Sequence, residues 1–139
     1  MARRILAIDS SIAVKWFSEE DKTAEALALR DSHIDGQLTI LTTQLLSCEV
    51  ANALRFKPGY DHKQLSDALK NLLKLHLLEN RIDLTLLSRS AEIAFKCNVT
   101  IYDAIPVAVA VLNKTKCVTA DRDTQYSRIK PNNYPIELL

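Results

Sequence analysis

The chain has 139 residues, a length typical of one compact domain. Its composition, 47% hydrophobic and 25% charged, is that of a folded globular protein and excludes a largely disordered chain. The formal net charge of +1 gives no bulk attraction to nucleic acid or anionic membranes, so any binding of a polyanion must depend on local groups. We therefore expect a single domain over residues 1–139.

Membrane insertion and disulfide chemistry are both disfavoured. No apolar stretch reaches the ~18 residues that a membrane-spanning helix needs, and the first residues lack the apolar core of a secretory signal, so we expect a cytoplasmic protein. The cysteines are odd in number and lie in apolar surroundings, which favours buried reduced thiols. The histidines show no zinc-ligand spacing, which favours solvated surface side chains. These residues are Cys48, Cys97, Cys117, His33, His62 and His76.

The first segments alternate between strand and helix patterns. Arg4–Ile8 is an apolar run of strand length, and it stops at Asp9 and two serines, which favour helix N-caps and turns. One or two helical turns over residues 11–17 follow. A helix is expected over residues 19–30, because its acidic beginning suits the positive end of the helix dipole.

The helix that follows the second predicted strand carries an acidic side chain on its inward, apolar face. Residues 38–42 are rich in β-branched side chains and predict a strand. Beyond it, Leu46, Val50 and Leu54 recur at the helical period, and Glu49 shares their inward face. Helix capping does not explain an acid on the apolar face of a helix middle, so Glu49 is a candidate functional residue.

Residues 61–78 show leucines at helical spacing with lysines between them, which predicts the longest helix of the chain. A leucine stripe of this kind is typical of the core or of a dimer contact. A short strand near residues 81–82 and a helix over residues 84–95 are expected next.

The last third is expected to hold one helix and two short strands. Residues 102–112 fit either a strand or a buried helix, and Pro106 favours the helix, because with Asp103 as N-cap the proline falls in the first turn. Short strands are expected over residues 116–119 and 134–138. The alternation predicts an α/β sandwich with a mainly parallel sheet, in which function gathers beyond the carboxyl ends of the strands.

Four acidic residues lie where an apolar segment ends or a helix begins, or on an inward helix face. Burying an isolated carboxylate is costly, and hard divalent cations are the usual partner of several such oxygens. Taken singly, Asp9 and Asp103 also fit as helix caps, each worth about 1 kcal/mol. Neither a glycine-rich phosphate loop nor a convincing Ser-His-Asp order is present. The four acids are Asp9, Glu49, Asp103 and Asp121.

The segments around these acids resemble the four signatures of the PIN domain family, and the order and chain length resemble its VapC-type toxins. The resemblance implies a three-layer α/β/α sandwich, a pocket holding Mg²⁺ or Mn²⁺, and endoribonuclease activity restrained by a small antitoxin protein. It also implies a homodimer. Pro106 departs from the family, in which a bulky side chain is usual there. The motifs are residues 8–16 (IDSSIAVKW), 48–54 (CEVANAL), 102–104 (YDA) and 118–123 (VTADRD).

The resemblance assigns roles residue by residue. Asp9 and Asp103 would coordinate the metal ion directly, Glu49 would coordinate it or position a water, and Asp121 would lie at the outer edge. Metal ions in such sites activate the water and stabilise the leaving oxygen. Supporting roles, such as holding a carboxylate in place, fall to Ser11, Thr119, Asp123 and Asn52.

Other functions remain open at this stage. An aspartyl phosphatase or phosphoacceptor would carry an Asp-x-Asp motif, whereas Asp9 is followed by two serines. A non-catalytic module that binds RNA or protein, and an RNA-processing nuclease outside a toxin–antitoxin pair, are the alternatives. Trp16 fits base stacking but more often belongs to the core. Basic residues that fit an RNA path, but are more often plain surface charges, are Lys15, Arg55, Lys57, Arg122 and Arg128.

Overall fold

The computed structural model describes residues 4–139 and shows a five-stranded sheet with the order β3-β2-β1-β4-β5. Every neighbouring pair of strands is parallel. The expected α/β sandwich is confirmed, and the sheet is wholly parallel where a mainly parallel one was predicted. The strands are β1 (Arg4–Ile8), β2 (Leu38–Thr43), β3 (Leu78–Asn80), β4 (Cys117–Thr119) and β5 (Ile136–Leu138).

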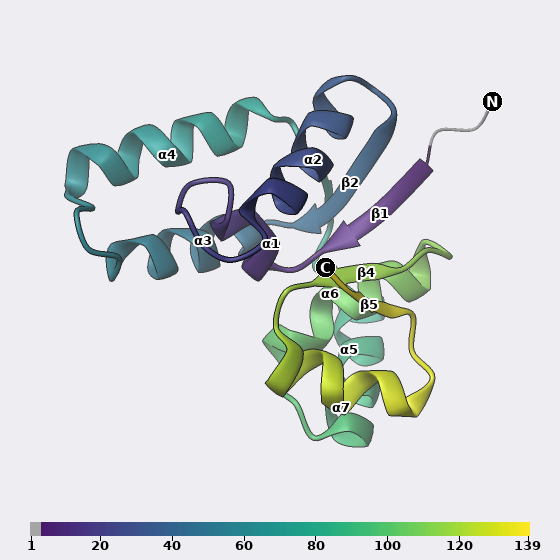
Figure 1. Ribbon diagram of the computed structural model, residues 1–139. Coiled ribbons are helices and arrows are strands. Elements are labelled where there is room, and N and C mark those ends of the chain that lie inside the picture. Colours follow the sequence, from purple (N-terminus) through teal and green to yellow (C-terminus); the bar gives the residue numbers. More distant parts are fainter. Residues whose placement is uncertain (1–3) are drawn as a thin grey trace.

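Helices cover both faces of the sheet, which makes the three layers (Figure 1). One group, drawn in purple to teal, lies on one side of β1, and the green to yellow group lies on the other. The first group is α1 (Ser10–Val14), α2 (Thr23–Ile34), α3 (Leu45–Arg55) and α4 (His62–Lys74). The second is α5 (Leu84–Cys97), α6 (Ile101–Leu112), the π-helix η1 (Arg122–Tyr126), α7 (Ser127–Ile129) and the 3-10 turn η2 (Lys130–Asn132).

Two apolar clusters fill the space between the sheet and its helices. Successive side chains of a strand point to opposite faces, so Leu6 and Ile8 of β1 enter the cluster beneath α1–α4, whereas Ala7 enters the one beneath α5 and α6. Ile40 and Leu41 of β2 divide in the same way. Burial on both faces explains why these strands are continuously apolar in sequence.

The beginning of α2 differs from the expectation. The acidic residues 19–21 precede the helix, which starts at Thr23 because Lys22 adopts a left-handed conformation with φ of 62°. The Thr23 hydroxyl instead accepts a hydrogen bond from the backbone N–H of Glu20 at 2.9 Å. The predicted start of this helix at residue 19 is therefore wrong, and the acidic residue of its first turn is Glu25.

The predictions for residues 61–82 were also partly wrong. Helix α4 ends at Lys74, because His76 turns the chain with a φ of 51°, and the strand lies at Leu78–Asn80 rather than near residue 81. At 13 residues α4 is one shorter than α5, so it is not the longest helix. Only part of its leucine stripe belongs to the core, because Leu72 is 3% exposed whereas Leu73 is 61% exposed.

Several local expectations need correction. Cys48 is exposed, whereas Cys97 and Cys117 are buried as expected. His33 is not a solvated side chain, because its ring nitrogens contact the carbonyl of Leu75 and the N–H of Ile40. The helical turns over residues 122–132 were not predicted.

Within residues 4–139, no single helix is long and apolar enough to cross a membrane. Helices α5 and α6 reach the required length and apolarity only as a pair, and that pair is bent by 117°.

Candidate active site

The site begins at the adjoining ends of β1 and β4. These strands pair in parallel, with Ile8 opposite Val118, so that Asp9 and Thr119 emerge side by side at the carboxyl edge of the sheet. The backbone N–H of Asp9 still donates to the carbonyl of Val118 at 3.3 Å, which continues the ladder by one residue. Asp121 follows β4 by two residues and reaches the same edge.

Asp9 is held by hydroxyl groups and does not cap a helix. It occupies the N-cap position of α1 but makes no side-chain cap hydrogen bond. Ser11 Oγ donates to Asp9 Oδ1 at 2.5 Å, and Thr119 Oγ1 lies 2.8 Å from Asp9 Oδ2. Ser11 in turn accepts the backbone N–H of Ala120 at 2.9 Å. With only 9% of its surface exposed, the Asp9 carboxylate is fixed in place by residues from both strand ends.

Asp103 is also free of a capping role. The N-cap of α6 is Thr100, whose hydroxyl accepts the backbone N–H of Asp103 at 3.1 Å. The expectation that Asp103 caps this helix is wrong. As a result Pro106 lies in the second turn, where its missing N–H leaves the carbonyl of Tyr102 without its usual helical partner. Asp103 is half-buried in the first turn, where the helix dipole favours a negative charge.

Glu49 approaches from α3, on the opposite face of the sheet from α6. It lines one narrow pocket together with Asp9, Ile105 and Pro106. Its carboxylate is partly buried. Asp121 differs from the other acids, because its carboxylate accepts the N–H of Thr124 at 3.0 Å and thereby caps η1.

The carboxylates lie close enough to raise one another's pKa. Burial, with smaller effects from the charges of Asp121 and Asp103, raises the pKa of Asp9 to about 6, although the hydrogen bonds from Ser11 and Thr119 act in the opposite direction. Burial, with the charges of Asp9 and Asp103, raises the pKa of Glu49 to about 7. Burial and Asp121 also raise the pKa of Asp103. The fold thus gathers four mutually repelling acids at one edge of the sheet.

The donor chemistry of this cluster fits a hard divalent cation. All the candidate ligands are carboxylate oxygens, and a compensating positive charge would stabilise the ionised forms of Asp9, Glu49 and Asp103, whose pKa values are raised. In the part of the chain described, no three His, Cys, Asp or Glu side chains are close enough to enclose an ion by themselves. Mg²⁺ does not need such an enclosure, because it commonly binds through one or two carboxylates and keeps several waters.

Gln125 is part of the site and carries no signal in the sequence. Its side chain is 1% exposed, although the neighbouring residues 122–124 are exposed. Its Nε2 donates to the backbone carbonyl of Asp103 at 2.8 Å, and its Oε1 lies 2.8 Å from Thr119 Oγ1. Of the other predicted supporting residues, Ser11 and Thr119 contact Asp9, whereas Asn52 and Asp123 are exposed.

Two of the basic residues that might have lined an RNA path have acidic partners. Lys15 and Lys57 lie 3.4 and 2.9 Å from the carboxylate oxygens of Glu20. Burial alone would raise the pKa of Glu20, but the hydrogen bond and charge of Lys57, helped by Lys15, lower it. Trp16 is 7% exposed and donates its Nε1–H to the carbonyl of Ala26, so it belongs to the core.

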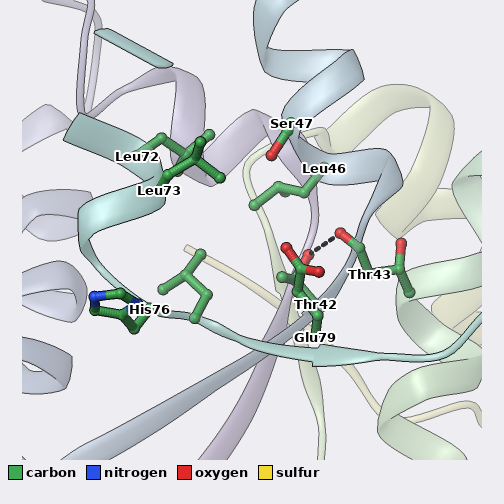
Figure 2. A pocket seen from close by; sticks show the side chains of 9 residues that line it. Thr42, Thr43, Leu46, Ser47, Leu72, Leu73, His76 and Glu79 are labelled. Atoms are coloured by element: carbon green, nitrogen blue, oxygen red, sulfur yellow. Dashed lines mark hydrogen bonds between the residues drawn. The ribbon is translucent and has the colours of Figure 1, made fainter. Parts of the chain in front are cut away.

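A larger cavity of about 320 Å³ adjoins the carboxylate pocket. Figure 2 shows Leu72 and Leu73 of α4 on one side of it and Leu46 and Thr43 on the other. Leu46, Thr43 and Thr42 line both this cavity and the pocket of Asp9 and Glu49. The acidic site therefore opens towards the groove between α3 and α4.

Comparison with known proteins agrees with this arrangement. A family model described as PIN domain matches residues 6–130. The chain belongs to the PIN domain family. A search of curated proteins gives no match.

Several solved structures share the fold of this chain. VapBC2 from Rickettsia felis, bound to a DNA fragment from its promoter, has 15% identity, a TM-score of 0.68 and coverage of 97% of this chain and 98% of that chain. VapC20 from Mycobacterium tuberculosis, described as a toxin that cleaves the sarcin–ricin loop, has 14% identity, a TM-score of 0.69 and coverage of 93% and 95%. PAE2754 from Pyrobaculum aerophilum has 26% identity, a TM-score of 0.60 and coverage of 88% and 84%.

Proposed function

We propose that this PIN domain protein is a metal-dependent endoribonuclease that hydrolyses phosphodiester bonds of RNA. The observation that carries the proposal is the convergence of acids from distant segments: Asp9 and Glu49 line one pocket at the carboxyl edge of the sheet, and Asp103 and Asp121 are near enough for their charges to act on Asp9. Hydrolysis of a phosphodiester needs an activated water and compensation of the phosphate charge. A divalent cation bound at these acids supplies both.

Within this site Asp9 and Asp103 would hold the Mg²⁺ or Mn²⁺, and Asp121 would lie at its edge. Ser11 and Thr119 keep the two oxygens of Asp9 in fixed directions. Glu49 either coordinates the ion or positions the attacking water. Without metal, burial and the charges of Asp9 and Asp103 raise the pKa of Glu49 to about 7. A bound cation would lower this pKa, so Glu49 would be an ionised carboxylate able to accept a proton from that water at Oε.

We further propose that the protein is the toxin of a type II toxin–antitoxin pair and is a homodimer. Structural neighbours include the VapBC2 complex, a toxin–antitoxin complex from Klebsiella pneumoniae and the FitAcB structure from Neisseria gonorrhoeae, which supports a small antitoxin protein as partner. An RNA-processing role outside such a pair uses the same chemistry. A gene for a small DNA-binding protein directly upstream would favour the toxin.

The test is cleavage of end-labelled RNA by the purified protein in Mg²⁺ or Mn²⁺, with EDTA as the metal-free control. We expect Asp9→Asn and Asp103→Asn to lower the cleavage rate by about 100-fold or more, because each removes a charge on which phosphate transfer depends. Asp35→Asn, at an exposed position at the end of α2 and away from the site, is the matched control and should cut normally. RNA binding without cleavage by the wild type would instead support a non-catalytic binding module.

A further inference from the structure

Gln125 connects the two halves of the acidic site. Its amide uses both ends: Nε2 donates to the backbone carbonyl of Asp103, and Oε1 faces the hydroxyl of Thr119, each at 2.8 Å. Thr119 belongs to the strand end that holds Asp9, and Asp103 lies at the beginning of α6. The glutamine is therefore a direct bridge between the elements that carry these two acids.

The orientation of the amide follows from its partners. The carbonyl of Asp103 has no hydrogen to give, so Nε2 must face it and Oε1 must face Thr119. The Thr119 hydroxyl has a single hydrogen, yet Asp9 Oδ2 and Gln125 Oε1 both lie 2.8 Å from its oxygen. Gln125 consequently competes with Asp9 for that hydrogen and influences how firmly Thr119 holds the carboxylate.

The local backbone explains how a polar residue becomes buried here. Asp121 caps the turn at Thr124, and the N–H of Tyr126 reaches back to the carbonyl of Asp121, which makes a wide π-helical turn. Gln125 points inwards from this turn while residues 122–124 remain exposed. π-helical turns are uncommon and are found frequently at functional sites.

We propose that Gln125 is a positioning residue that sets the separation of Asp9 and Asp103, an inference that rests on the proposed nuclease function. It touches neither the substrate nor the reacting water. Its role is to tie the first turn of α6 to the end of β4, so that the two carboxylates keep a fixed spacing. Small misplacements of catalytic groups are costly, about 100-fold in rate for roughly 1 Å.

The variants separate this role from simple burial. Gln125→Met has nearly the same size and makes neither hydrogen bond. Gln125→Glu keeps an acceptor for Thr119 and, in its ionised form, loses the donor to the Asp103 carbonyl and adds a negative charge to the site. Ser90→Ala is the matched control, because Ser90 is fully buried and donates to the carbonyl of Leu86 within α5, without contact to the site. All three variants should melt at a somewhat lower temperature than the wild type.

We expect Gln125→Met and Gln125→Glu to lower kcat by about tenfold or more with KM changed by less than about twofold, because binding of the RNA is retained and only the spacing of the acids is lost. Ser90→Ala should leave both constants unchanged. A kcat for Gln125→Met that equals that of the wild type or of Ser90→Ala would overturn the proposal.

Hydrogen exchange of the metal-free protein gives a readout that does not depend on activity. The backbone amides of Asp103 and Ala104 should exchange faster in Gln125→Met than in the wild type, and at the wild-type rate in Ser90→Ala. Unchanged exchange in Gln125→Met would refute the bridge. If the wild type cuts no RNA while exchange rises as expected, the bridge stands and the nuclease proposal fails, so the two failures are distinguishable.

Discussion

Asp9 shows a conflict between stability and function at a single residue. The site needs its negative charge to attract a cation, whereas burial raises the pKa of Asp9 from the ordinary value of 3.8 to about 6. A carboxylate in this position is therefore less stable in the folded protein than in the unfolded chain. Stabilising interactions from Ser11 and Thr119 reduce this cost without removing it.

Removing the charge of Asp9 should therefore stabilise the metal-free protein. An acid with a raised pKa in the folded state binds its proton more tightly there than in the unfolded chain. Protonation of Asp9 therefore stabilises the fold in full below pH 3.8, and this stabilisation is lost as the pH rises through about 6. In Asp9→Asn the amide also donates to Thr119, which frees that hydroxyl for Gln125. We expect the variant to gain up to about 3 kcal/mol relative to the wild type between pH 4 and pH 7.

Thermal unfolding in EDTA at a series of pH values measures this difference. The wild type and Asp9→Asn should be similarly stable near pH 4 and diverge as pH rises, and saturating Mg²⁺ should restore the wild type alone. A difference that stays constant with pH, or that shrinks as pH rises, would contradict the pKa of Asp9 inferred from its burial.

At the level of elements, helix α6 depends on its first turn to place Asp103. Thr100 caps this helix through its hydroxyl, and Thr100→Ala should cost about 1 kcal/mol of stability. Because the same turn carries Asp103, we also expect a fall in the cleavage rate. The control is Asp61→Ala, which removes the capping box of α4 at similar cost.

Urea unfolding and RNA cleavage of the two cap variants test this assignment together. We expect both variants to lose the same free energy of unfolding. Only Thr100→Ala should also lose cleavage. Equal cleavage by both variants at a temperature where both are folded would show that the first turn of α6 does not position Asp103.

The same elements show which features local sequence can predict. The strand β1 and helices α3 and α6 were located correctly, because their apolar runs and periods are properties of neighbouring residues. The ends of α2 and α4 were missed, since they depend on left-handed conformations at Lys22 and His76, which side-chain pattern does not specify. The position of β3 is set by pairing with β2, a contact distant in sequence.

Sequence could predict only those site residues whose side-chain chemistry is unusual for their position. Acids that end strands or face inwards stand out, and Ser11 and Thr119 were named through the family resemblance. Gln125 has no such mark, because a glutamine in a polar segment is normally exposed. Its role becomes visible only when the π-helical turn places it between Thr119 and Asp103.

At the level of the whole molecule, the two apolar clusters lie on opposite faces of one sheet. Leu6 and Ile8 face one cluster and Ala7 the other, so β1 belongs to both. We expect the chain to unfold as one cooperative unit, in keeping with the prediction of a single domain. Calorimetric and van't Hoff enthalpies of unfolding should therefore agree. Two resolved transitions would show that the clusters are independent.

The central claim is that side chains from distant parts of the chain, on β1, α3, α6 and the end of β4, converge to hold a divalent cation. Isothermal titration calorimetry of the metal-free protein with Mn²⁺ tests this claim most directly. We expect saturable binding by the wild type and by Asp35→Asn, and loss of that binding in Asp9→Asn and Asp103→Asn. Absence of Mn²⁺ binding by the wild type, or equal binding by all four proteins, would contradict it.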